Sequence, residues 1–161
     1  MRRAWTAVVA ILMAASVGAH AAGWPTKPVR VVIPFGAGSA TDVIPRIVLD
    51  KLSQQLGQTF VVENRGGAGS TLGAATVARA EPDGYTLLAT SSAHTIVPAL
   101  YPNLSYDAAR DFTAVGAIGS VPNVLIIAPS RGIKNIKDFV AAAKAKPGSF
   151  TFASLGVGSA V

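Results

Sequence analysis

The residues whose types and spacing suit chemistry in this sequence are glycines and hydroxyl side chains, gathered in three loops. The loops are Gly36-Ala37-Gly38-Ser39, Arg65-Gly66-Gly67-Ala68-Gly69-Ser70 and Gly156-Val157-Gly158-Ser159. Glycine lets the backbone approach a ligand closely, and a helix that follows directs unpaired N–H groups and the positive end of its dipole toward the same place. The ligand that this arrangement favours is an anion such as a carboxylate or a phosphate.

Hydroxyl groups in or beside these loops add hydrogen-bond donors; they belong to Ser39, Thr41, Ser70 and Ser159. A turn that only joins a strand to a helix has the same composition, so each loop taken alone is equally well explained as a connection. Three such loops in one chain favour a binding site.

A dinucleotide-binding enzyme of the oxidoreductase type is one alternative. Gly36 and Gly38 follow a predicted strand and precede a predicted helix, and Glu63 ends the next strand, where an acid that binds ribose is expected. Thr41 stands where the third glycine of that fingerprint belongs, and the P-loop pattern is absent. This alternative stays open on the sequence alone.

A secreted hydrolase is the other alternative, and it has less support. The sequence contains no G-x-S-x-G motif, and His94 is the only histidine beyond the first twenty residues. A lone histidine is more often a hydrogen-bonded structural residue than a catalyst, and Asp42 is better explained as a helix cap or a brace for the loop. Spacing typical of metal ligands is missing, so we expect no metal and no cofactor.

The first 21 residues have the order of a secretory signal peptide. A positive start, Met1 to Arg3, precedes an uncharged run, Ala4 to Gly18, and the A-x-A pattern Ala19-His20-Ala21. The apolar run is shorter than the roughly 20 residues that a membrane-spanning helix needs. We therefore expect export, with cleavage after Ala21.

Strands and helices alternate in the pattern that positions these loops. We expect strands at 29–35, 59–63, 85–90, 115–118, 124–128 and 150–153, and helices at 43–56, 72–80 and 136–143. Pro45 places the start of the first helix near Asp42, with Thr41 or Asp42 as its cap, and Gly57 ends it. Asn135 is the expected cap of the last helix. This order predicts an α/β fold with a doubly wound, mostly parallel sheet, whose ligands bind at the carboxyl ends of the strands.

Composition limits the remaining classes. Half of the 161 residues are hydrophobic, 14% are charged and none is cysteine, which indicates a folded core without disulfides or cysteine-bound metal. The net charge of +6 comes from scattered lysines and arginines, and the aromatic residues do not interleave with a basic patch. Nucleic acid is therefore not an expected partner.

Three stretches of the sequence closely resemble the Bug family, the substrate-binding proteins of tripartite tricarboxylate transporters. They run from Pro34 to Ile44, from Val62 to Ser70 and from Pro82 to Leu88, and the likeness continues to Ser159. The resemblance implies a periplasmic binding protein of type 2-like fold that captures a small carboxylate between two lobes, without catalysis. It also implies the membrane subunits of such a transporter as partners, and a monomer at full length.

The resemblance further implies which residues bind the ligand. They are Phe35, Gly36, Ala37, Gly38, Ser39, Thr41 and Asp42 of the first loop, Ser91, Ser92 and His94, and Ser154, Leu155, Gly156, Gly158 and Ser159. Residues 22–123 then form the first lobe, and residues 124–161 begin a second lobe that is truncated here. With half of the clamp absent, we expect the isolated chain to bind carboxylates weakly.

Overall fold

Three short parallel strands form the centre of the structure, a computed structural model in which residues 23–153 and residue 157 are described. They are β1 (Val29–Ile33), β2 (Phe60–Asn64) and β3 (Thr86–Leu88), in the spatial order β2-β1-β3. Both pairings with β1 are parallel. The carboxyl ends of all three strands therefore lie at one edge of the sheet, which confirms the predicted α/β fold with a parallel sheet.

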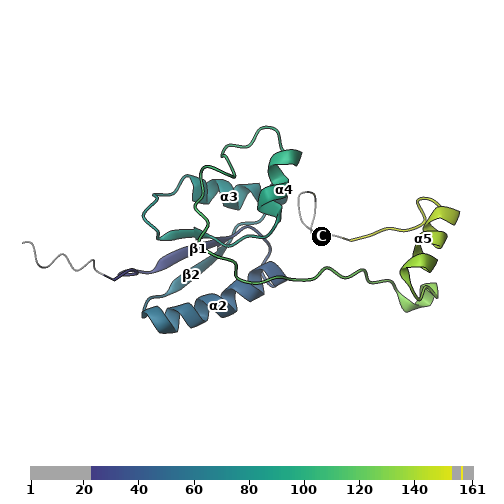
Figure 1. Cartoon of the computed structure of the whole chain (residues 1–161), viewed down its shortest axis with the longest axis horizontal. Helices are drawn as coiled ribbons and strands as arrows, with labels where there is room; N and C mark the ends of the chain where they lie inside the picture. Colours follow the sequence, from purple (N-terminus) through teal and green to yellow (C-terminus); the bar gives the residue numbers. More distant parts are fainter. Residues whose placement is uncertain (1–22, 154–156, 158–161) are drawn as a thin grey trace, which may run out of the picture.

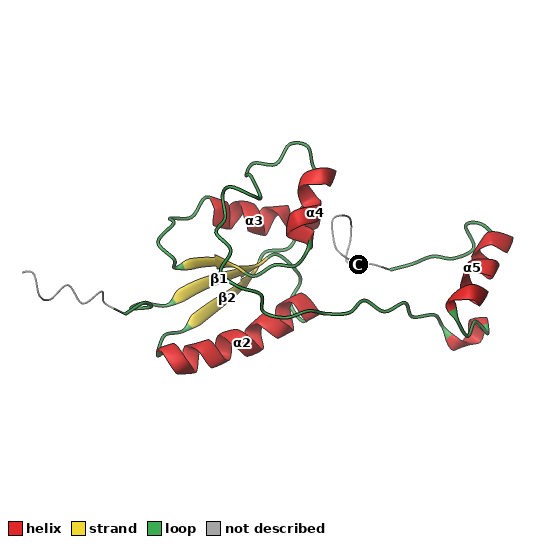
Figure 2. Cartoon of the chain, in the orientation of Figure 1, coloured by secondary structure: helices red, strands yellow, loops and turns green. Residues whose placement is uncertain are grey.

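The helices alternate with the strands along the chain. They are α2 (Ala40–Leu56), α3 (Thr71–Ala78), α4 (Ala93–Leu100) and α5 (Ile136–Ala145), with short 3-10 helices η1 (Ala68–Ser70) and η2 (Pro129–Arg131). Helix α2 lies on one side of the sheet and α3 on the other (Figures 1 and 2). The sheet is thus covered on both faces, as the mostly apolar sequence of β1 predicts.

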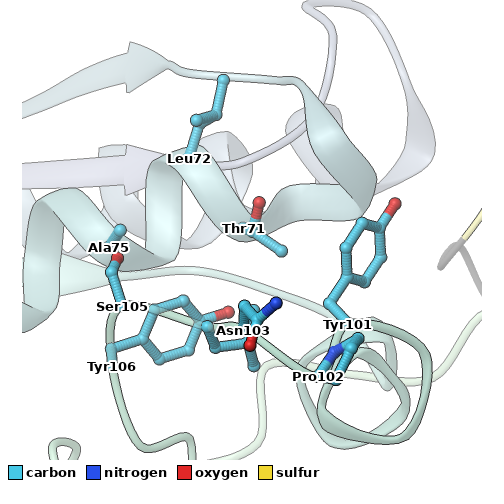
Figure 3. A pocket seen from close by; sticks show the side chains of 9 residues that line it. Thr71, Leu72, Ala75, Tyr101, Pro102, Asn103, Ser105 and Tyr106 are labelled. Carbon is cyan, nitrogen blue, oxygen red and sulfur yellow. The ribbon is translucent and has the colours of Figure 1, made fainter.

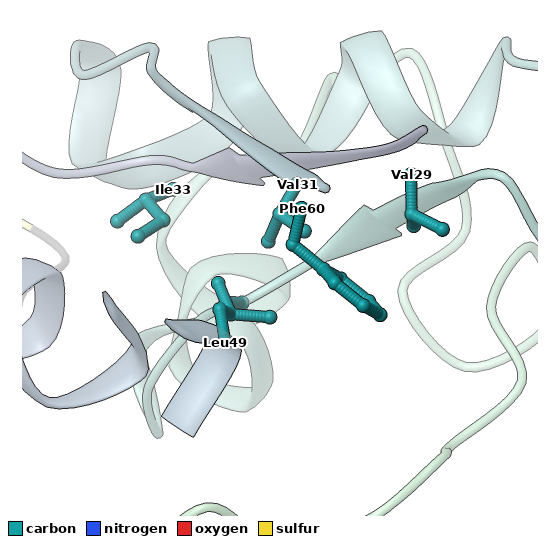
Figure 4. Close-up of a cluster of buried hydrophobic side chains, with 6 residues drawn as sticks. Val29, Val31, Ile33, Leu49 and Phe60 are labelled. Carbon is teal, nitrogen blue, oxygen red and sulfur yellow. The ribbon is translucent and has the colours of Figure 1, made fainter. Parts of the chain in front are cut away.

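The core lies between β1, β2 and α2. Its buried side chains are those of Val29, Val31, Ile33, Leu49, Phe60 and Ala89 (Figure 4). Alternate residues of a strand point to opposite faces, so Val32, which is also fully buried, faces the side of α3. Burial of a side chain of this size stabilises the fold by about 1.5–3 kcal/mol. This core fixes the edge of the sheet from which the loops project.

Helix α2 differs from the expectation at its beginning and agrees at its end. It begins at Ala40, and its N-cap is Ser39, so the prediction that Thr41 or Asp42 caps it is wrong. The carboxylate of Asp42 instead accepts a hydrogen bond from the N–H of Gly38, in the loop before the helix. Gly57 ends the helix as predicted, in the left-handed conformation at φ 68°, where its N–H donates to Ser53 O.

Helix α5 confirms the predicted last helix and its cap. The Asn135 side chain accepts a hydrogen bond from the Asp138 N–H at 3.0 Å. None of the residues of α5 is buried, and Figure 1 shows the helix away from the sheet.

In the described part of the chain, every helix is too short or too polar to span a membrane.

The expected strands at 115–118, 124–128 and 150–153 are wrong. A strand is held by the backbone groups of a neighbour, and in the described part of the chain no strand lies beside these segments. Their side chains are left in solvent: Val115 is 87% exposed, Ile126 84% and Phe152 91%. Sequence patterns detect the apolar character of such segments but not whether a partner is present.

Helix α4 lies in a part of the sequence where no helix was predicted. It is short and contains Pro98. Its buried residues are Ala93 and Val97, which lie one turn apart on the same face. Tertiary packing of that one face, rather than local propensity, accounts for the helix.

Candidate functional site: the carboxyl edge of the sheet

The loops after β1 and β2 are joined to each other at the carboxyl edge of the sheet. The N–H of Arg65 donates to Ile33 O at 2.8 Å, and the Asn64 side chain donates to Phe35 O at 3.0 Å. A Cβ atom added at Gly66 would come within ordinary contact distance of the backbone of Phe35. Helix α4, which follows β3, contacts η1 of the second loop. Two of the three predicted glycine loops therefore meet in space.

Asp42 is the centre of a hydrogen-bond network under the first loop. Its side chain is 3% exposed. One carboxylate oxygen accepts the N–H of Gly38 at 2.8 Å, and the other accepts from Arg46 Nε and Asn64 Nδ2, each at 2.8 Å. Both oxygens are thus engaged, which agrees with the interpretation of Asp42 as a brace for the loop.

The charge of Asp42 is stabilised in place. Burial raises the pKa of its carboxyl, but the hydrogen bonds from Asn64, Gly38 and Arg46, with the charge of Arg46, outweigh that effect and hold the pKa below its usual range. Asp42 therefore stays ionised at neutral pH, and its negative charge is compensated within the network.

Asn64 and Arg46 belong to this network, and sequence reasoning missed both. Arg46 Nη2 also donates to Asn64 Oδ1 at 2.7 Å, which closes the network. The spacing of Asp42 and Arg46, one helical turn apart, is a signal that could have found their ion pair. Asn64 lies far from both in the sequence, and no sequence pattern connects it to them.

The tip of the first loop is open to solvent. Gly36, Ala37 and Gly38 are exposed, and Gly38 adopts φ +84°, which favours glycine. Ser39 O accepts the N–H groups of Asp42 and Val43. The Ser39 hydroxyl oxygen is buried and has no hydrogen-bond partner among the described residues. This loop offers a helix N-terminus and an unused hydroxyl close together.

The second loop has a constrained backbone. Ala68 and Ser70 adopt φ values of 45° and 84°, which side-chain-bearing residues rarely do, and Ser70 is buried. Gly69 is tightly enclosed, since an added Cβ would lie 2.6 Å from Val157 O and 3.0 Å from the Tyr101 hydroxyl. Surrounding contacts therefore fix the shape of this loop.

Ser91, Ser92 and His94 lie at the start of α4. Ser91 Oγ accepts the Ala93 N–H at 3.2 Å, and Ser92 is exposed. His94 Nε2 is 2.9 Å from Ala108 O. Both serines follow β3, at the carboxyl edge of the sheet.

The ring of His94 belongs to an aromatic cluster. It lies edge-on to Phe112, with centroids 4.8 Å apart, and parallel to Tyr106 at 6.5 Å. The role that these contacts support is structural, as the sequence interpretation of a lone histidine had it. The predicted role of His94 in ligand binding stays a prediction.

Ser154, Leu155, Gly156, Gly158 and Ser159 lie outside the described residues. Only Val157 of that loop is described, and its carbonyl oxygen accepts from the Tyr101 hydroxyl at 3.5 Å. The predicted contribution of this loop to binding therefore stays a prediction.

Glu63 is held in ion pairs with two arginines. Its carboxylate accepts from Arg30 at 2.8 and 2.9 Å and from Arg65 at 3.1 Å. The hydrogen bonds from Arg30 lower the pKa of Glu63, and burial raises it. The hydrogen bond from Arg65 and the charges of both arginines add to the lowering, so the pKa falls to about 2. Because Glu63 is engaged by these arginines, the structure weighs against the dinucleotide alternative.

Among the described residues, no group of His, Asp or Glu side chains has the arrangement to hold a metal ion.

A separate cavity of about 320 Å³ lies between α3 and the 101–106 segment (Figure 3). Its lining residues are Thr71, Leu72, Ala75, Tyr101, Pro102, Asn103, Leu104, Ser105 and Tyr106. None of them is charged, and none is in the set predicted to bind a ligand. Burial raises the pKa of the Tyr106 phenol, whose hydroxyl has no partner among the described residues.

A parallel α/β layer with glycine loops and a helix N-terminus at its carboxyl edge is the architecture of one lobe of a periplasmic solute-binding protein. Residues 44–161 match the family described as TctC, the tripartite tricarboxylate transporter family receptor. The chain belongs to this family, a family of solute-binding receptors and not of enzymes. The resemblance to the Bug proteins is thereby confirmed.

Individual relatives agree with the family. Protein BugT of Bordetella pertussis is 36% identical over 138 residues, which cover 84% of this chain and 42% of that protein. The structure of Rpa4515 of R. palustris with adipate is 36% identical, has a TM-score of 0.74, and covers 78% of this chain and 42% of its own. MatC of Rhodopseudomonas palustris with bound malate is 34% identical, has a TM-score of 0.67, and covers 76% and 42%.

The chain spans less than half of the length of the curated relatives that it matches. The likeness to solved periplasmic binding proteins confirms the predicted fold over the part that is shared.

Proposed function

We propose that this chain forms the amino-terminal ligand-binding lobe of an extracytoplasmic receptor for a small organic carboxylate, which it binds without chemical conversion. The observation that carries the proposal is the braced first loop. Exposed Gly36 to Gly38 precede the N-terminus of α2, beside the unused Ser39 hydroxyl. Two relatives of the same fold were solved with adipate and with malate, both dicarboxylates.

The chemistry of binding follows from the first turn of α2. A helix leaves its first N–H groups without partners inside the helix. Those of Asp42 and Val43 donate to Ser39 O, so those of Ala40 and Thr41 remain for a ligand. Asp42 holds the loop through Gly38 and adds no free charge of its own. A carboxylate placed here accepts N–H donors and lies at the positive end of the helix dipole.

The proposal extends to the organisation of the chain. Residues 1–21 act as a signal peptide, residues 22–123 form the first lobe and residues 124–161 begin the second. Support for the boundary comes from the extended segment that separates the α/β unit from α5. Because the family consists of periplasmic receptors, we place this protein in the periplasm, with the membrane subunits of a tripartite tricarboxylate transporter as its partners.

The test is to follow backbone amide signals of the ¹⁵N-labelled chain by nuclear magnetic resonance during titration with adipate and with malate. We expect changes centred on residues 36–41 and an affinity on the order of millimolar, since one lobe supplies only part of the contacts. Adipamide, which has the same length as adipate but no charge, is the matched control and should leave these signals in place.

Two results would overturn the proposal. One is the absence of change at residues 36–41 with either dicarboxylate at concentrations far above millimolar. The other is an equal response to adipamide, which would remove the role of charge. Titration with NAD tests the dinucleotide alternative, because that function requires NAD to shift the signals of residues 36–41.

A further inference from the structure

We infer that Asn64 is a positioning residue of the proposed carboxylate site, which holds the Phe35–Asp42 loop in the shape that receives the ligand. The inference rests on the proposed function. Asn64 is the last residue of β2 and pairs with Ile33 of β1. From there its side chain reaches over the carboxyl edge to the loop that follows β1.

Every polar group of the Asn64 side chain that faces the loop has a partner. Its Nδ2 donates to Phe35 O at 3.0 Å and to the Asp42 carboxylate at 2.8 Å, and its Oδ1 accepts from Arg46 at 2.7 Å. A carbonyl and a carboxylate only accept, and a guanidinium only donates. The partners therefore dictate the orientation of the amide, and only an amide satisfies all three.

Asn64 acts on the ligand site through two links. Through Phe35 it fixes the start of the loop, and through Asp42 it fixes the carboxylate that accepts the Gly38 N–H. Loss of the amide would leave Phe35 O without this donor and Asp42 with one donor fewer. The glycine turn between these two points would then lose its defined shape, and with it the directed N–H groups at the start of α2.

Aspartate at position 64 is the informative change, because it replaces the donating NH₂ group by an oxygen. The new carboxylate would face the Asp42 carboxylate at hydrogen-bond distance. Arg46 of α2 is the charged group that faces both, while Arg65 and Arg30 are turned to Glu63 on the same strand. Two carboxylates so close cannot both ionise freely, so the pair will take up a shared proton as the pH falls.

The experiment compares Asn64→Asp, Asn64→Ala and the control Asn103→Asp, a change in an exposed loop residue outside the network. The first readout is the hydrogen-exchange protection of the Gly38 amide, which needs no ligand. We expect protection to fall about tenfold or more in both Asn64 variants at pH 7 and to stay unchanged in the control.

The second readout is the affinity for malate and adipate relative to the wild-type chain at each pH, which cancels titration of the ligand itself. Asn64→Asp should bind about tenfold more weakly at pH 7 and recover toward wild type near pH 5. Asn64→Ala should be weakened at both pH values, because it has no proton to gain. A purely structural loss would not produce this difference in pH profile.

Unchanged Gly38 protection with unchanged affinity in both variants would overturn the inference. Equal pH profiles for Asn64→Asp and Asn64→Ala would overturn it as well, and so would loss of folding in both, since Asn64 would then belong to the core. If the wild-type chain binds neither dicarboxylate, the proposed function fails, whereas Gly38 protection still reports whether Asn64 holds the loop.

Discussion

Gly73 of α3 packs tightly against Pro34, which follows β1, and replacing it by alanine tests the packing beside the site. An added Cβ would lie 2.7 Å from Pro34 Cβ, 2.9 Å from Arg65 O and 3.0 Å from Pro34 Cα. Contacting carbon atoms normally lie about 3.5–4.0 Å apart. Neither neighbour can rotate away, because Arg65 offers its backbone carbonyl and Pro34 is fully buried. Helix α3 must therefore shift by roughly 1 Å.

Two opposing effects set the magnitude. Alanine is favoured over glycine in a helix by about 0.8–1 kcal/mol, whereas overpacking of a buried contact costs about 1–3 kcal/mol. Because the neighbouring atoms are rigid, we expect the upper part of that range and a net loss of about 1–2 kcal/mol in the free energy of unfolding for Gly73→Ala.

Urea unfolding followed by circular dichroism measures this difference. The control is Gly116→Ala, where an added Cβ meets no atom within 4 Å, and we expect it to change stability by less than about 0.5 kcal/mol. A Gly73→Ala variant as stable as the wild type, or more stable, would refute the reasoning. Helix propensity would then be the only effect present, and α3 would not be held against Pro34.

Two further predictions follow from the site. Ser39→Ala should weaken dicarboxylate binding by about 0.5–1.5 kcal/mol in a calorimetric or spectroscopic titration, whereas the exposed Ser120→Ala should not; equal affinities would place the Ser39 hydroxyl outside the site. The lowered pKa of Glu63 means that its ion pairs stabilise the fold above about pH 4.5 and are lost as the pH falls toward about 2. Acid unfolding of Arg30→Gln should lose part of this pH dependence, and an identical acid profile would contradict the assignment.

The elements that the sequence predicts correctly have their causes close by in the chain. The residues of β1 are apolar except for Arg30, α2 ends before Gly57, and α5 begins after Asn135, whose side chain caps it. Each of these signals acts over a few residues. The parallel order of the strands follows from the alternation of strands and helices and is equally readable.

The errors arise where structure depends on distant groups. An apolar segment such as 124–128 has the composition of a strand, but composition does not state whether another strand is present to pair with it. The site shows the same limit. Its glycines are visible in the sequence, whereas the bond from Asn64 to Phe35 joins residues that come together only after β1 and β2 have paired.

The charges around the carboxyl edge indicate how the proposed site would distinguish a carboxylate from other small molecules. Two arginines of the joined loops and α2 are already in ion pairs: Arg46 pairs with Asp42, and Arg65 pairs with Glu63. Attraction for the ligand must then come mainly from backbone N–H groups and the dipole of α2, which recognise a carboxylate group and not the skeleton that carries it. On the proposed function, such a site binds the carboxylate end that malate and adipate share. Selection between such acids then falls to whatever surrounds the rest of the molecule.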